Sequence, residues 1–243
     1  MRQNKLFYPP IIYILSILYI ILSYVVLAMG DEILQISIHE DQYFELVSAV
    51  GFFITAILFL VSFFLTHRRK HEHPWSWMAP VIFLGLFILF VFGAGEEISW
   101  GQRIFGFDTP DYLSSVNKQD ELNLHNLAAI DAGQFFSADR LFDIFWITFT
   151  IILPLGYTLV PFVRTRIAER FGYSVPIPHW SLGVLFLFNY LWAKVAKIIF
   201  QAGYTYQLIP FKQAVQEIKE CNYAILFVLV GLSFILTYRQ KQS

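Results

Sequence analysis

Long apolar runs separated by short polar stretches dominate this chain of 243 residues. A helix needs about 20 mostly apolar residues to cross the hydrocarbon core of a bilayer. By that length the pattern predicts six transmembrane helices, at about 9–30, 46–66, 76–98, 141–163, 180–200 and 221–238. The fifth reaches full length only if Lys194 and Lys197 are accepted within it. The predicted fold is all-α, a polytopic membrane helical bundle that forms a single membrane domain over residues 1–243.

The charged residues between the runs predict which way the chain faces. Lysine and arginine occur near both termini and in every second loop between the spans. The loop between the first two spans is acidic instead and has no lysine or arginine. Cytoplasmic loops carry an excess of Lys and Arg. Both termini are therefore predicted to be cytoplasmic, with residues 101–139 forming an extracytoplasmic segment. The basic residues concerned are Arg2, Lys5, Arg68, Arg69, Lys70, Arg164, Arg166, Arg170, Arg239 and Lys241.

Composition agrees with a membrane protein and excludes a soluble one. Hydrophobic residues make up 57% of the chain and charged residues only 14%, against about 25% charged in a soluble domain. The single cysteine, Cys221, cannot form an intramolecular disulfide. We expect membrane lipids as partners and no nucleic acid, and leave a membrane-protein partner open.

The stretch GEEISWGQR, residues 95–103, places three ionisable residues where the third apolar run ends. Ionisable groups in a membrane helix are costly and are functional candidates by default. Helical spacing would put Glu96 and Arg103 on one face, with Ser99 and Trp100. Glu97 would lie on the next face.

That next face carries two glycines, Gly93 and Gly101, one turn on either side of Glu97. Glycines allow a second helix or a ligand to come close. Two interpretations remain open. The glutamates form a site, or they belong to a structural network in which Glu96 pairs with Arg103 and Glu97 with a lysine elsewhere.

A second polar block, NKQDELNLHN at residues 117–126, follows in the extracytoplasmic segment. Its Glu121 and His125 are four residues apart, so a helix would place both on one face, as metal ligation or an acid/base pair requires. The alternative is a polar loop capped by its own Asn and Asp side chains. The amides of the block are Asn117, Gln119, Asn123 and Asn126.

Lys194 and Lys197 lie close to the same predicted end of the fifth span. Two lysines at that depth are expected to face inward, where they would neutralise Glu96 or Glu97 or hold an anionic group of a substrate. Snorkelling to the interface is the alternative.

Together these residues predict a polar pocket at the extracytoplasmic end of span three. The catalytic candidates are Glu96, Glu97 and His125, and the metal candidates, for a divalent ion, are Glu97, Glu121 and His125. The candidates for substrate binding are Arg103, Asn117, Gln119, Asn123, Asn126, Lys194 and Lys197. We expect the pocket to bind or act on a lipid or lipid-linked headgroup, as a hydrolase or transferase if it is an enzyme at all. The alternative is a non-catalytic accessory or binding subunit of a membrane complex.

The two blocks also carry a resemblance. GEEISWGQR followed by an N-x-Q-x-E-x-N-x-H-N block resembles the pattern of an uncharacterised family of multi-pass bacterial membrane proteins. The resemblance implies a protein of the bacterial inner (plasma) membrane and implies no particular activity.

Overall fold

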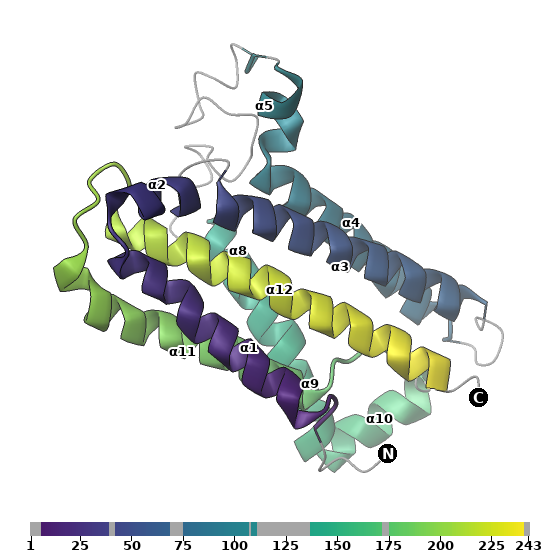
Figure 1. The fold of residues 1–243 in the computed structure, drawn as a ribbon. Coiled ribbons are helices and arrows are strands. Elements are labelled where there is room, and N and C mark those ends of the chain that lie inside the picture. The colour runs from purple at the N-terminus through teal and green to yellow at the C-terminus, as the bar shows by residue number, and fades with distance from the viewer. Residues whose placement is uncertain are drawn as a thin grey trace.

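The structure is a computed structural model that describes residues 6–38, 42–68, 75–106, 108–110, 137–171 and 175–240. Within these ranges every regular element is a helix. Six helical stretches are long and apolar enough to cross a membrane, which confirms the predicted all-α multi-pass bundle. Figure 1 shows them packed side by side, with α12 running between α1 and α3.

The first three spans follow the predicted runs closely. The first is α1 (Pro10–Ser23), continued by the 3-10 helix η1 (Tyr24–Ala28). The second is α3 (Tyr43–His67), and the third is α4 (Met78–Glu97). A short helix that the sequence pattern does not predict, α2 (Asp31–Ile38), precedes α3.

The last three spans depart more from the predicted limits. Span four comprises α8 (Ala138–Ile147), a π-helical turn η3 (Thr148–Ile152) and α9 (Leu153–Leu159), and a separate helix α10 (Pro161–Phe171) follows it. Span five is α11 (Trp180–Phe200), extended by η4 (Gln201–Gly203). Span six, α12 (Phe211–Gln240), begins ten residues before the predicted start at 221. The prediction cut this helix short because its first turns are polar.

The π-helical turn in span four has a local cause. Pro154 lacks an N–H and its ring would collide with the carbonyl of Thr150, four residues earlier in a regular α-helix. Widening the turn at Thr148–Ile152 removes that collision. The Thr150 carbonyl then lies against Gly183 of α11, where a side chain would not fit.

The core is built on α3, which packs along both α4 and α12. Small residues permit this close approach: a Cβ on Gly231 of α12 would stand 2.8 Å from the Leu58 Cβ of α3. Phenylalanine rings fill the space between these helices, as in the edge-to-face pair Phe90–Phe227 at 4.8 Å between centroids.

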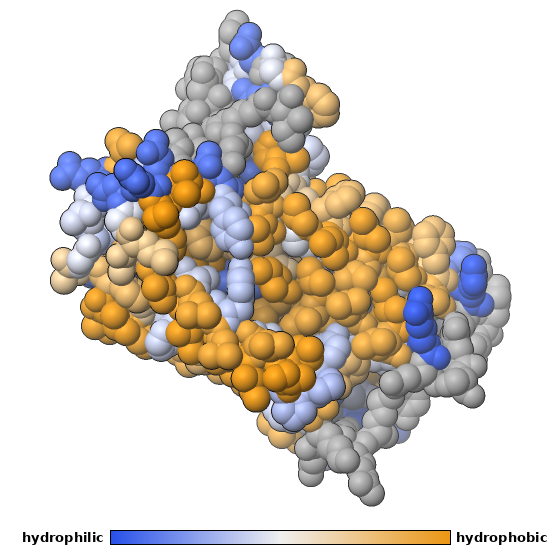
Figure 2. Space-filling model, viewed as in Figure 1, coloured by the Kyte–Doolittle hydropathy of each residue, from blue (hydrophilic) through white to orange (hydrophobic). Residues whose placement is uncertain are grey.

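The outer surface is apolar along the spans and polar at the ends. Figure 2 shows hydrophobic side chains covering the sides of the bundle, with hydrophilic ones near α2 and near the ends of α3 and α12. An even number of spans brings the start of α1 and the end of α12 toward the same end of the bundle. The opposite end, where α4 ends and α12 begins, is called the Glu97 end below.

Candidate functional site

The helix of span three ends at Glu97, and the chain then makes a left-handed turn. Ser99, Trp100 and Gly101 all have positive φ, at 45°, 54° and 77°. Such φ values cost a non-glycine residue about 1 kcal/mol or more, and they persist only where the surroundings hold them. The expectation that one continuous helix carries Glu96, Ser99, Trp100 and Arg103 on a single face is therefore wrong, as is a helical face shared by Glu97 and Gly101.

Trp100 is held in this turn by contacts back to α4. Its Nε1 donates a hydrogen bond of 2.6 Å to Glu96 Oε1. Its ring lies over Gly95, where an added Cβ would meet the ring at 2.9 Å, and edge-on to Phe92 at 5.5 Å between centroids. These contacts give Gly95, Glu96 and Trp100 a structural role in the turn. The catalytic role of Glu96 stays a prediction.

Glu97 lies in a group of carboxylates contributed by three helices. The charges that act on it most strongly are those of Glu220 and Glu217 of α12, followed by Glu45 of α3 and the adjacent Glu96. We call Glu45, Glu97, Glu217 and Glu220 the carboxylate group; all four side chains are half-buried. No residue that the structure describes donates a hydrogen bond to Glu97, whereas Gln216 Nε2 donates one to Glu220 Oε1.

Sequence reasoning found Glu97 but not its three carboxylate partners. Glu45 was assigned to an acidic loop, and Glu217 and Glu220 fell outside the predicted sixth span. A usable signal was present. Extending helical spacing backward from Cys221 places Glu217 and Glu220 on one face with Ala224, the residue that contacts Gly51 of α3.

Glu97 can attract a cation, because the neighbouring carboxylates repel its negative charge and a cation beside it would offset that repulsion. Within the described ranges, no group of three or more His, Cys, Asp or Glu side chains has an arrangement that could hold a metal ion. The predicted metal set of Glu97, Glu121 and His125 stays a prediction, because Glu121 and His125 lie outside those ranges.

The other predicted residues around residue 120 have the same status. Asn117, Gln119, Asn123 and Asn126 lie outside the described part of the chain. Arg103 belongs to the short helix α5 (Gln102–Phe105), but its side chain is not among those described, so its pairing with Glu96 stays untested. Next to it, Gln102 Nε2 donates a hydrogen bond of 2.6 Å to Thr109 Oγ1, which ties α5 to the following segment.

The two predicted lysines of span five do not neutralise the glutamates. The Lys194 ammonium lies 4.4 Å from the centroid of the Tyr190 ring. The charges that act on Lys197 are those of other lysines, Lys219 and Lys212 of α12 and its neighbour Lys194. Lys194 and Lys197 make no ion pair with Glu96 or Glu97, because these lysines belong to a separate cationic surface of α11 and α12.

A buried polar network joins α11, α12 and η1 inside the bundle. Asn189 Nδ2 donates to the Lys219 carbonyl, and Asn222 Nδ2 donates to Asn189 Oδ1, both at 3.0 Å. Tyr24 also donates to Asn189 Oδ1, at 3.4 Å. Side chain bonds of this kind fix the rotation of neighbouring membrane helices. Asn189 and Asn222 are fully buried, and sequence reasoning gave neither a role.

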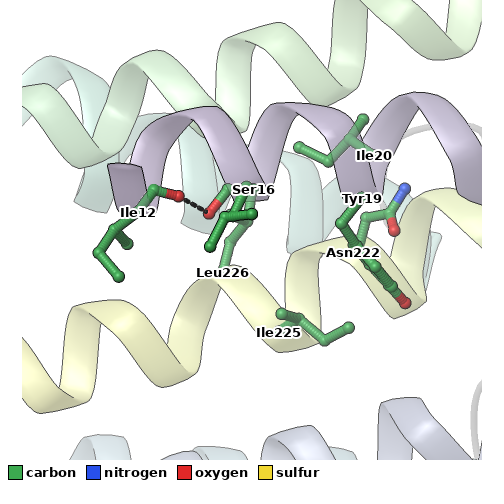
Figure 3. A pocket seen from close by; sticks show the side chains of 8 residues that line it. Ile12, Ser16, Tyr19, Ile20, Asn222, Ile225 and Leu226 are labelled. Atoms are coloured by element: carbon green, nitrogen blue, oxygen red, sulfur yellow. Dashed lines mark hydrogen bonds between the residues drawn. The ribbon is translucent and has the colours of Figure 1, made fainter. Parts of the chain in front are cut away.

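A hollow of about 260 Å³ lies between α1 and α12. Figure 3 shows Asn222 and Tyr19 together at one end of it, and Ser16 donating to the Ile12 carbonyl. The hollow contains no predicted site residue, and most of its wall is apolar. Its lining residues are Ile12, Leu15, Ser16, Tyr19, Ile20, Asn222, Ile225 and Leu226.

The candidate site is thus the carboxylate group at the end of α4, beside the strained turn. No model of a protein family, no curated protein and no solved structure matches this chain.

Proposed function

We propose that this chain is a multi-pass protein of the bacterial inner membrane that binds the headgroup of a lipid or lipid-linked molecule at its Glu97 end. Both termini lie in the cytoplasm and the Glu97 end faces outward. This orientation is supported by the basic residues that flank the two termini and the loops at the opposite end, although the Glu97 end carries lysines of its own on α11 and α12. The single observation that carries the proposal is the position of Glu97. No described residue donates a hydrogen bond to its carboxylate, which lies near Glu45, Glu217 and Glu220 at a helix end, and a cation bound to Glu97 would offset the repulsion that these charges exert on it.

A cation can reach this place in two chemical forms. One is a divalent metal ion, which Glu97 would hold together with the predicted ligands Glu121 and His125, and which would in turn bind a phosphate of the headgroup. The other is an amine carried by the headgroup itself. In either form Glu97 contacts the ligand, and in an enzyme it would act as the general base or as a metal ligand.

A non-catalytic accessory subunit is the second candidate, and one observation favours it. Phe105 of α5 is 78% exposed and Trp100 is 42% exposed. Figure 1 shows α5 extending beyond the end of α4. Aromatic residues exposed at the end of a bundle suit contact with a partner protein.

The test compares bound metal and lipid in purified wild type and Glu97→Gln, by elemental analysis and mass spectrometry. The matched control is Glu169→Gln. Glu169 is an exposed residue of α10, at the end of the bundle opposite the Glu97 end. We expect the metal or lipid to be lost from Glu97→Gln and retained in Glu169→Gln, with both variants folded in detergent. Equal metal and lipid content in all three proteins would refute the site, and co-purification of a stable partner would then support the accessory role.

A further inference from the structure

Four lysines gather at the Glu97 end, on the two neighbouring helices α11 and α12. Lys194 and Lys197 lie in the last two turns of α11, and Lys212 and Lys219 in the first three turns of α12. The two helices pack against each other. We call these four residues the lysine group. Lys194 and Lys212 are exposed, Lys197 is half-buried and Lys219 is buried.

Lys219 is the most informative member, because the residue is only 9% exposed and no residue that the structure describes accepts a hydrogen bond from its ammonium. Among the described residues its ion-pair partner is Asp143 Oδ1 of α8, at 4.0 Å, which is beyond hydrogen-bond distance. That same oxygen accepts a hydrogen bond of 2.8 Å from Trp146 Nε1. A buried ammonium in this state is unfavourable unless an acceptor reaches it.

The neighbouring lysines repel one another, and this repulsion favours the binding of an anion between them. The charged groups that act on Lys197 are Lys219, Lys212 and Lys194, and no carboxylate is among them. Among the described residues one carboxylate, Asp143, pairs with one of these four lysines, Lys219, which leaves an excess of three positive charges in that part of the chain. An anion bound between Lys197 and Lys219 would accept hydrogen bonds from both and offset the repulsion.

The surroundings favour a phospholipid as the source of that anion. Ile198, one residue from Lys197, is 82% exposed, and Ile199 is 55% exposed, so the lysines stand beside a surface suited to acyl chains. Lysine binds phosphate as a compact point charge. We infer that the lysine group binds the phosphate of an anionic phospholipid at the outer face of the membrane. The inference rests on the proposed function for the outward orientation of the Glu97 end only. It uses no residue of the carboxylate group, and the binding test in detergent does not depend on that orientation.

The test measures binding of phosphatidylglycerol, and of phosphatidylcholine for comparison, to the full chain in detergent by native mass spectrometry. We expect phosphatidylglycerol to bind more tightly than phosphatidylcholine, and Lys197→Gln to weaken it about fivefold, the loss typical of one lysine at a charged membrane surface. Lys197→Arg keeps the charge and should retain the binding. Arg166→Gln removes an exposed cation from α10, far from the site. It should leave the difference in binding between phosphatidylglycerol and phosphatidylcholine unchanged.

A second variant separates ligand binding from folding. Lys219→Met keeps the length of the side chain and removes its charge. We expect it to raise the thermal unfolding temperature in neutral detergent, because a largely buried ammonium with only a long ion pair to Asp143 is gone, and to remove the stabilisation that phosphatidylglycerol gives to wild type. A purely structural Lys219 would instead lower the unfolding temperature in both conditions, and that result would overturn the inference.

A third arm identifies the source of the phosphate. Inorganic phosphate at millimolar concentration should not displace phosphatidylglycerol. If phosphate displaces phosphatidylglycerol, and if phosphate binding is also weakened by Lys197→Gln, the lysine group is still a phosphate site but its ligand is a free anion. Equal binding of both lipids and of phosphate by wild type and Lys197→Gln would overturn the inference.

Discussion

The carbonyl oxygen of Thr150 lies against Gly183, where span four crosses span five. The contact is between two backbones, so neither side can yield as a flexible side chain would. It follows from Pro154, which forces the π-helical turn and thereby turns the Thr150 carbonyl toward α11.

Replacing Gly183 with alanine should therefore destabilise the protein strongly. Overpacking of this kind costs roughly 1–3 kcal/mol, and a backbone contact belongs at the upper end of that range. Gly156→Ala is the control, since a Cβ there meets nothing within 4 Å, and alanine in a helix is about 1 kcal/mol better than glycine. Thermal unfolding in detergent measures both, and similar stability of the two variants would contradict the contact.

Trp100→Phe should loosen the turn after α4. The substitution keeps an aromatic ring beside Gly95 but removes part of the indole that lies over it and the hydrogen bond from Nε1 to Glu96, and a hydrogen bond to a charged group contributes about 1.5–3 kcal/mol. Trp77→Phe is the control, because Trp77 is 48% exposed and its described contact is a ring contact with Trp75. Urea unfolding in mild detergent compares them. An equal loss in both variants would mean that the Glu96 bond contributes nothing.

The orientation of the bundle can be measured with cysteine labelling, because the native Cys221 is fully buried. Leu208→Cys is at the Glu97 end, where Leu208 is 72% exposed, and Thr165→Cys is on exposed helix α10 at the other end. With the cytoplasm at the α10 end, a membrane-impermeant maleimide should label Leu208→Cys in intact spheroplasts. Thr165→Cys should react only after permeabilisation. The reverse pattern would place the carboxylate group in the cytoplasm.

His179 should make the stability of the chain depend on pH. Its Nδ1 accepts a hydrogen bond from the Ser181 backbone N–H at the start of α11, and burial lowers the pKa of His179 from its usual 6.5. The unfolded chain therefore binds more protons than the folded one in this range, so stability is present above about pH 6.5 and is lost as the pH falls through the folded pKa.

Unfolding temperatures measured from pH 7.5 to pH 5 check this dependence. His179→Asn retains a good helix cap that does not titrate, so its curve should be flatter than that of wild type. The same fall in both proteins would assign the acid sensitivity to other groups.

The sequence was sufficient for the spans but not for the site. The length of the apolar runs located all six spans, once Lys194 and Lys197 were accepted in the fifth, because a bilayer imposes that length on every crossing helix. The same criterion excluded Glu217 and Glu220 from α12, since a helix continues through charged residues once it has left the hydrocarbon core. Sequence spacing also assumed that the helix ran on past Glu97. The positive φ of Ser99 and Trp100 depends on the contact between Trp100 and Gly95, which helical periodicity does not anticipate.

The length of α12 has a consequence for how the protein sits in membranes of different thickness. Its 30 residues extend about 45 Å at 1.5 Å per residue, against about 30 Å of hydrocarbon. The excess carries Lys212, Glu217 and Glu220 at one end and Arg239 at the other. In a thicker bilayer these charges would lie closer to the hydrocarbon, which costs free energy. In a thinner bilayer the helix would only need to tilt. The protein should therefore favour thin membranes, and changes in thickness should move the carboxylate and lysine groups together, because both include residues of this one helix.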